Sequence, residues 1–314
     1  MPPKIAVLTG PTATGKTALG VALASALNGE IVGADSMQLY RYMDIGTAKP
    51  TKEEQQGIPH HMIDCVSPQE NYSVSRYVED ASRVIDDILS RGKLPILVGG
   101  TNLYIDSLLS GRSFAPEGSS TGLRQTLARE WAERGGEAML EELRQVDPES
   151  ANRLHLHDQK RILRALEIYR ATGRTKSAWD RETQLLPPRY EAGILALTFE
   201  NRQDLYDRID HRVDQMMERG LQREVSALLS RGLDPDSTAM QAIGYKEMVS
   251  ALRGECSVSE AADRIRQSSR QYAKRQLSWL RRNGSLHWIS WQKNPDLQFG
   301  LQDSTEFLKA SGVL

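Results

Sequence analysis

Hydrophobic residues near the start of the chain form short continuous runs, separated by a segment with helical spacing. The runs are "KIAVLTG" (4–10) and "EIVGADS" (30–36). Between them, apolar residues recur every three or four positions over 16–29, which predicts a helix, and Gly29 is expected to end it. The pattern indicates a strand, a helix and a second strand.

The same succession continues further along the chain. A helix is predicted over 72–93, and residues 94–111 are predicted to form a strand, a glycine turn and a helix. The strands are apolar throughout instead of alternating, which is typical of a parallel sheet covered by helices on both faces. We therefore predict an α/β fold with a parallel sheet flanked by helices.

Two breaks interrupt this pattern in the middle of the chain. A Pro/Gly/Ser-rich stretch at 113–122 precedes strongly helical sequence, and a second break at 183–193 precedes another apolar run at 194–199. The return to strand character predicts a helical insertion domain, 115–190, within a core made of 1–114 and 191–314. Residues 200–282 are predicted to be mostly helical, with a break at 232–245.

The composition is that of an ordinary globular protein. Of 314 residues, 39% are hydrophobic and 26% are charged, and no apolar stretch is long enough to span a bilayer. The apolar run at the N-terminus is too short for a signal peptide. Cys65 and Cys256 are far apart, so a disulfide framework is not expected, and a reducing cytoplasm is the expected location.

The charge is unevenly distributed. The net charge is −1, yet the segment 264–282 carries seven Lys/Arg residues and no acidic residue. A solvated, salt-bridged helix face is the ordinary explanation of such a run, but the lack of acidic partners favours contact with a polyanion. As single residues, Trp279 and Trp288 fit a core position better than a base-stacking one.

The segment "GPTATGKT" (10–17) matches the phosphate-loop pattern and has the required context, a strand before it and a helix after it. Its backbone N–H groups and the helix N-terminus suit an anion, and a chance glycine turn is a poor alternative. Thr17 is the expected Mg²⁺ ligand. The residues predicted to bind a diphosphate are Gly10, Pro11, Thr12, Ala13, Thr14, Gly15, Lys16 and Thr17.

Two further polar residues follow predicted strands, Asp35 after the second and Thr101 after "ILVGG" (96–100). Either could be a helix N-cap, but their place beside the phosphate loop favours a functional role for Asp35. A kinase should have a Walker-B carboxylate and a lid with clustered arginines. The strand that should supply the carboxylate ends in glycine, so the phosphoryl-transfer apparatus is incomplete.

His60 and His61 lie near Asp64 and Cys65, which raises the question of a zinc site. Adjacent side chains on an extended segment point apart, and no second ligand cluster follows in the sequence. Metal binding by this pair is therefore not expected.

Seven segments, taken together, resemble the bacterial tRNA dimethylallyltransferases, also called tRNA isopentenyltransferases, over about residues 4–290. The segment 35–50 is the most specific of them. In chain order they are "GPTATGKT" (10–17), "DSMQLYRYMDIGTAKP" (35–50), "GIPHHMIDCVSPQENYSVSRY" (57–77), "LVGGTNLY" (97–104), "DQKRILRALEIYRATG" (158–173), "QAIGYKE" (241–247) and "KRQLSWLR" (274–281).

The resemblance implies a P-loop-type fold, a cytoplasmic location and a monomer. It also implies transfer of a dimethylallyl group from dimethylallyl diphosphate to N6 of adenosine 37, within A36-A37-A38, in tRNAs that read codons starting with U. The products are N6-dimethylallyladenosine and diphosphate. The phosphate loop would then hold a diphosphate leaving group with Mg²⁺, and not ATP. A small-molecule kinase and an RNA-binding module remain the alternatives.

The resemblance also implies roles for individual residues. Asp35 matches the general base, Arg212 matches a basic residue that stabilises the leaving group, and Thr101 matches a residue near the reacting centre. The side-chain amide of Gln38 is expected beside the extruded adenine. The residues implied in tRNA binding are Asp35, Ser36, Met37, Gln38, Thr101, Arg124, Gln159, Lys160, Arg161, Ile162, Leu163, Gln241, Ala242, Ile243, Gly244, Tyr245, Lys246, Lys274, Arg275, Gln276, Trp279 and Arg281.

Overall fold

The structure is a computed structural model that describes residues 2–111, 114 and 121–314. It divides into two compact units. One, which we call the core unit, comprises Met1–Leu109 and Tyr190–Leu314, and the other, the insertion unit, comprises Ser110–Arg189. In the described part of the chain, no helix has the length and apolar character needed to cross a membrane.

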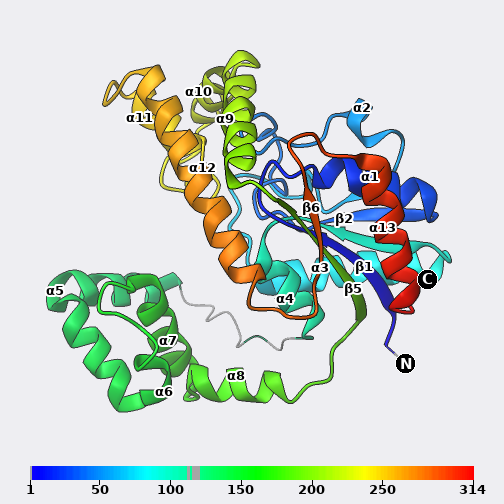
Figure 1. Cartoon of the computed structure of the whole chain (residues 1–314). Coiled ribbons are helices and arrows are strands. Elements are labelled where there is room, and N and C mark those ends of the chain that lie inside the picture. Colours follow the sequence, from blue (N-terminus) through cyan, green and yellow to red (C-terminus); the bar gives the residue numbers. More distant parts are fainter. Residues whose placement is uncertain (1, 112–113, 115–120) are drawn as a thin grey trace. The chain divides into compact units, whose positions relative to one another are not determined.

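The centre of the core unit is a six-stranded sheet in which every neighbouring pair is parallel (Figure 1). The strand order is β3-β2-β4-β1-β5-β6. The predicted parallel sheet is confirmed, because the strands are continuous apolar runs with both faces covered. The strands are β1 (Lys4–Thr9), β2 (Gly29–Gly33), β3 (His60–His61), β4 (Leu94–Val98), β5 (Glu191–Phe199) and β6 (His287–Trp291).

Helices lie on both faces of this sheet. The connections β1-α1-β2 and β3-α3-β4 run in opposite directions across the sheet, so right-handed crossovers place α1 (Lys16–Ala26) and α3 (Val74–Ser90) on opposite faces. Helix α13 (Leu297–Ala310) contacts α1, and α4 (Asn102–Leu109) contacts α3. The short α2 (Lys52–Gln55) precedes β3.

Four more helices pack against one another in the core unit, with α9 next to β5 (Figure 1). Each buries a stripe of apolar residues, and α9 and α12 lie along each other. This bundle stands beside the carboxyl ends of the strands, where parallel sheets place their ligands. The helices are α9 (Arg202–Glu218), α10 (Leu221–Ser230), α11 (Tyr245–Leu252) and α12 (Val258–Leu280).

The insertion unit is helical and has its own core, to which Met139, Leu143, Ile162 and Leu166 contribute. Gly135, with φ 78°, interrupts its first helix. The helices are α5 (Thr121–Val146), α6 (Pro148–Ala151), α7 (Gln159–Thr172) and α8 (Lys176–Gln184). Most of the predicted linker 113–122 lies outside the described residues.

Three details differ from the sequence-based expectations. Helix α1 ends two residues early, because Asn28 takes a left-handed φ of 50°. Gly29 is instead the first residue of β2, where a Cβ would lie 2.8 Å from the carbonyl oxygen of Leu94. Strand β6 and helix α13 were not predicted, although turn-forming residues lie on both sides of "HWISW" (287–291).

Candidate active site

The phosphate loop joins β1 to α1, as the sequence predicts. Gly15 adopts the left-handed φ of 85° that lets the chain turn into the helix. Inside the loop, the Thr14 hydroxyl donates to the Pro11 carbonyl at 2.8 Å. The Lys16 amino group donates to the carbonyls of Gly10 and Pro11, at 3.0 and 2.6 Å. The lysine therefore lies over the loop whose N–H groups form the anion site.

Three side chains from the C-terminal half of the chain hold this loop. Arg208 on α9 donates from Nε to the Ala13 carbonyl at 3.1 Å. Trp291 on β6 donates to the Thr14 carbonyl at 3.0 Å. Gln276 on α12 accepts the Thr12 N–H at 3.1 Å. The conformation of the loop thus depends on residues nearly 200 or more positions away.

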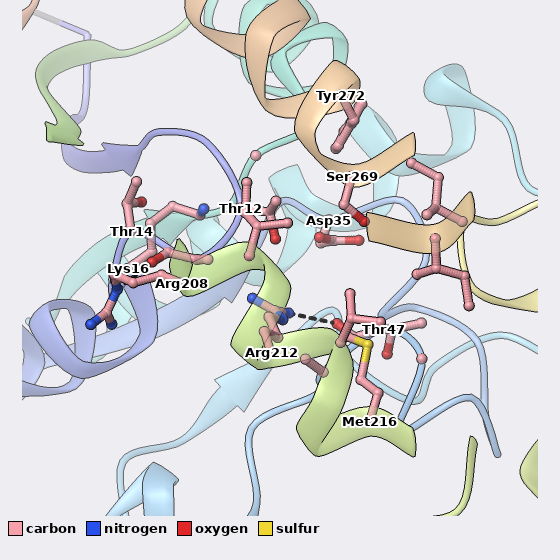
Figure 2. Close-up of a pocket in the computed structure, with 18 of the residues that line it drawn as sticks. Thr12, Thr14, Lys16, Asp35, Thr47, Arg208, Arg212, Met216, Ser269 and Tyr272 are labelled. Atoms are coloured by element: carbon pink, nitrogen blue, oxygen red, sulfur yellow. Dashed lines mark hydrogen bonds between the residues drawn. The ribbon is translucent and has the colours of Figure 1, made fainter. Parts of the chain in front are cut away.

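A cavity of about 970 Å³ opens in front of the loop (Figure 2). Its walls come from the phosphate loop, residues 35–38, residues 46–49, and the facing sides of α9 and α12. Arg212 and Met216 project into it from α9, and Ser269 and Tyr272 from α12. This volume is at the upper end of the range for small-molecule sites, so the cavity has room for a diphosphate ester together with a base.

Asp35 lines the cavity just past the end of β2. Its Oδ1 accepts the N–H groups of Met37 at 2.9 Å and Gln38 at 3.4 Å. These bonds orient the carboxylate, and its Oδ2 accepts no hydrogen bond from the described residues. The side chain thus serves as a turn cap and still presents one oxygen to the cavity (Figure 2).

Thr101 lies behind this wall and does not line the cavity. Its Oγ1 accepts the Ser36 N–H at 3.0 Å, and its carbonyl begins α4. Its hydroxyl also donates to the Ser36 Oγ at 3.4 Å. The structure therefore places Thr101 where it orients Ser36, which does line the cavity.

The segment that ends in "DIGTAK" (44–49) forms the opposite wall, and two residues hold its backbone. Arg212 donates to the Thr47 carbonyl at 3.4 Å. The Glu224 carboxylate on α10 accepts three consecutive N–H groups, those of residues 44–46, at 2.8 to 3.1 Å. Glu224 also accepts the Tyr245 hydroxyl at 2.6 Å.

Gln38 only partly meets the expectation for an adenine-reading amide. Its Nε2 donates to the carbonyls of Thr47 and Ala48 at 3.1 and 3.2 Å. Both amide hydrogens are therefore used, which leaves the side-chain oxygen as the group that can meet a ligand.

The charges in the cavity act on one another. Burial, and then the nearby Arg212 guanidinium, lower the pKa of Lys16 to about 7, while the Asp35 carboxylate opposes the change. Burial also lowers the pKa of Arg212. Burial and the Asp35 carboxylate raise the pKa of Tyr272 to about 12. Lys16, Arg212 and Asp35 thus interact electrostatically inside the cavity, where the two basic side chains attract an anion.

The basic segment on α12 is less exposed to ligands than its composition suggests. Arg270 pairs with Asp210 on α9 at 2.6 Å, and Arg266 pairs with Asp214 on the same helix. The expectation of seven cations without acidic partners is therefore wrong for these two. Their partners lie 50 to 60 residues earlier and are invisible in the composition of the segment.

Other cations on α12 and directly after it remain available. Lys274, Arg275 and Arg281 are exposed, and Arg275 lines the cavity. Trp279 is 43% exposed and donates from its indole N–H to Asp106 at 2.8 Å, so the expectation of a core position for it is wrong. Trp288 on β6 is only partly buried, so it does not reach the core position expected for it.

Several residues that the resemblance assigns to tRNA binding have buried side chains. Ile162 belongs to the core of the insertion unit, Tyr245 is fully buried against Glu224, and Gln276 is 4% exposed. These three side chains therefore expose little surface to an RNA ligand, although Gln276 also lines the cavity. Ala242 and Gly244 are also buried.

The other residues of that set are accessible. Gln241, Ile243 and Lys246 line the cavity. In the insertion unit, the first residues of α7 (Gln159, Lys160 and Arg161) are exposed, Leu163 is half-buried, and Arg124 pairs with Glu167 at 2.6 Å.

Thr17 is the one predicted metal ligand, and its side chain lines the cavity at the start of α1. Among the described residues no group of three or more His, Cys, Asp or Glu side chains is placed to bind a metal. Mg²⁺ commonly keeps waters and substrate phosphates as ligands, so one hydroxyl beside a diphosphate site fits its chemistry. His60 bonds to the Ile58 carbonyl and His61 to Glu30, so the two rings do not converge.

The structure adds residues that sequence reasoning did not assign to the site. Arg208, Ser269, Tyr272 and Lys293 all line the cavity. The spacing of these residues along the sequence could have indicated some of them. Arg208 and Arg212 are four positions apart on one face of α9, and Ser269, Tyr272 and Gln276 follow i, i+3, i+7 on α12.

Comparisons with known protein families agree on one group. The model of the family described as IPP transferase matches residues 38–283, and that of isopentenyl transferase matches residues 3–70. A tRNA dimethylallyltransferase of Acetivibrio thermocellus is 46% identical over 286 residues, 91% of either chain. One of Geobacter sulfurreducens is 45% identical over 293 residues, which covers 93% of this chain and 94% of the relative.

Solved structures give the same grouping. The full-length tRNA isopentenylpyrophosphate transferase of Bacillus halodurans is 38% identical, with a TM-score of 0.73 over 98% of both chains. A eukaryotic dimethylallyltransferase, described as acting on tRNA, is 30% identical. Its TM-score is 0.82, over 99% of this chain and 79% of the other.

Proposed function

Because this chain belongs to the IPP transferase family, the tRNA dimethylallyltransferases, and is therefore a prenyltransferase, we propose the following reaction for it. It transfers a dimethylallyl group from dimethylallyl diphosphate to N6 of adenosine 37 in tRNA. The products are N6-dimethylallyladenosine and diphosphate. Family membership leaves the kinase and the RNA-binding module without support.

One observation carries the proposal. A single cavity brings the phosphate loop, with Lys16, opposite Asp35 and Arg212. Lys16 and both of these residues are close enough to interact electrostatically, since their charges act on the pKa of the lysine. An anion site and a base on facing walls suit an alkyl transfer in which diphosphate leaves from one side and an amine attacks from the other.

The attacking group in this proposal is the exocyclic amine of adenine. Its lone pair is delocalised into the ring, so it is a weak nucleophile until its proton is removed. As the N6–C1 bond forms, the C1–O bond to the diphosphate breaks and its electron pair leaves with oxygen. The N6 proton passes to Asp35, whose carboxylate is held by the Met37 and Gln38 N–H groups.

The departing diphosphate accumulates negative charge, and the loop side of the cavity is built to receive it. The loop N–H groups, Lys16 and Arg212 all stabilise that charge. When bound, Mg²⁺ on Thr17 supplies further neutralisation of the phosphate oxygens. The adenine of the tRNA closes the cavity and keeps water from the allylic carbon, where water would otherwise attack.

Adenosine 37 is stacked within the anticodon loop, so it must be extruded to reach Asp35. We propose that the anticodon stem-loop, with A36-A37-A38, lies against the exposed cations of α12, Lys274, Arg275 and Arg281. These would hold its phosphates. The exposed start of α7 offers a second contact surface. One chain supplies every element of this site, so we propose a monomer.

The test is an assay with labelled dimethylallyl diphosphate and a tRNA that carries A36-A37-A38. We expect label in the tRNA, and mass analysis of nucleoside 37 should show one added dimethylallyl group. The substitution D35N keeps the shape of the side chain but removes the base, so turnover should fall by roughly 10²- to 10⁴-fold. Binding of tRNA should stay within about twofold, because Asp35 touches only one base.

The matched control is E79Q, which removes a carboxylate from an exposed position of α3 and should leave turnover unchanged. Absence of label with the unaltered protein would contradict the proposed reaction. Turnover that survives in D35N would contradict only the assignment of Asp35 as the general base, and not the proposed reaction.

A further inference from the structure

Gln276 lies among the basic residues of α12, yet its side chain turns away from them and is buried. Its Oε1 accepts the Thr12 N–H at 3.1 Å, and its Nε2 donates to the Gly100 carbonyl at 2.8 Å. One amide therefore bridges the phosphate loop and the turn after β4. These are the two glycine-containing turns that border the cavity.

The sequence around Gly100 is shaped for this bridge. A Cβ at Gly100 would lie 2.4 Å from the Nε2 of Gln276, so any other residue there displaces the amide. Glycine is required at the preceding position, Gly99, by a different contact. A Cβ at Gly99 would lie 2.1 Å from the Ala34 carbonyl oxygen. The second glycine of the "GG" pair is thus explained by its contact with α12.

The bridge controls the direction of a peptide unit. A hydrogen bond from the Thr12 N–H to a fixed acceptor sets the plane of the peptide before Thr12. The next N–H groups of the loop follow from that plane, and an anion site at a loop depends on several N–H groups pointing to one place. Since both ends of the Gln276 amide are satisfied by backbone groups, replacing it leaves the part-buried Thr12 N–H and the buried Gly100 carbonyl without this partner.

We propose that Gln276 is a positioning residue for the diphosphate site: it holds the phosphate loop in the conformation that binds diphosphate, and it is not a tRNA contact. The inference rests on the proposed function for the identity of the ligand. It makes the opposite prediction to a role in RNA binding, because the two roles act on different substrates.

The experiment is a steady-state comparison of Q276M with the unaltered enzyme, in which each substrate is varied at saturation of the other. Methionine keeps the length and removes both hydrogen bonds. We expect KM for dimethylallyl diphosphate to rise about tenfold, the effect of losing about 1.4 kcal/mol, while KM for tRNA stays within about twofold. K274E should show the reverse split, because that residue is exposed.

Two further variants and one direct measurement complete the test. G100A pushes the Gln276 amide away from the other side and should raise the same KM, even if Q276M folds poorly. Q271M alters an exposed glutamine on the same helix and should change neither KM. Calorimetric titration with pyrophosphate should show a Kd raised about tenfold in both Q276M and G100A.

Three results would overturn the inference: a raised KM for tRNA alone in Q276M, a lower kcat with both KM values unchanged, or an unaltered Kd for pyrophosphate. If the unaltered protein fails to modify tRNA, the proposed function fails. The pyrophosphate titration then still tests the bridge by itself.

Discussion

Lys16 should take up a proton when diphosphate binds, and the amount can be worked out from its surroundings. Burial and the positive charge of Arg212 lower the pKa of Lys16 to about 7 in the free protein. At pH 8 a lysine with that pKa carries its proton in about one molecule in ten. A bound diphosphate places negative charge beside the amino group and raises its pKa again, so nearly every bound molecule is protonated.

The expected uptake follows directly. Lys16 should contribute about 0.9 proton at pH 8, about 0.5 at pH 7 and about 0.1 at pH 6. The sign is fixed, since the protonated form binds the anion better. The contribution of Lys16 to the affinity for pyrophosphate should therefore be largest below pH 7. It should fall, by up to about tenfold per pH unit, as the pH rises above 7 toward the usual lysine range.

Isothermal titration calorimetry with pyrophosphate, in buffers of different ionisation enthalpy, measures this number. The slope of the observed enthalpy against the buffer enthalpy is the count of protons taken up. Pyrophosphate itself also titrates, so K16R is the matched control. Its guanidinium stays charged throughout the range, and it retains only the contribution of the ligand. The difference between the two proteins at pH 8 should be about 0.9 proton. Equal uptake by both would refute the argument, because Lys16 would then be charged before the ligand arrives.

Three other predictions follow from the same site. E224Q should lower the free energy of unfolding by about 1–3 kcal/mol in urea titrations, since three N–H groups and the Tyr245 hydroxyl lose a charged acceptor; a loss below about 0.5 kcal/mol would contradict it. R212Q should lower kcat/KM by roughly 10²- to 10³-fold, and should move the pH midpoint of pyrophosphate binding upward, because a cation that lowers the pKa of Lys16 is gone; an unmoved midpoint would argue against that cause. Charge reversal of Lys274 and Arg281 together should reduce the slope of log affinity for tRNA against log salt by about 1.5, and an unchanged slope would remove α12 from the interface.

Much of the active site was predictable because its signals are local. The phosphate loop is a contiguous motif between a strand and a helix, and its backbone geometry follows from residues next to one another. The position of Asp35 past a buried strand was predictable for the same reason. In a parallel sheet, the carboxyl ends of the strands share one edge, so Asp35 and the phosphate loop are expected at the same edge. The family could also be named from motifs and their order.

The partners of these motifs could not be predicted. The composition of α12 suggested free cations, but Arg270 is neutralised by Asp210, and only the packing of α12 on α9 brings them together. In the sequence, Glu224 is an ordinary helical glutamate. In the structure it accepts three N–H groups from a segment 178 to 180 positions earlier. Burial of Tyr245 likewise depends on the helices around it.

Gln276 illustrates the difference between what the sequence and the folded structure show. The amino-acid pattern was enough to predict that the segment around Gln276 is helical and basic, and that a phosphate loop lies near the start of the chain. That the Gln276 side chain contacts the loop could be seen only in the folded protein, because its hydrogen-bond partners are 176 and 264 residues away. Spacing along the chain specifies a helix face. Which neighbour that face contacts is set by packing, because hydrophobic contacts do not depend on how far apart two residues are in the sequence.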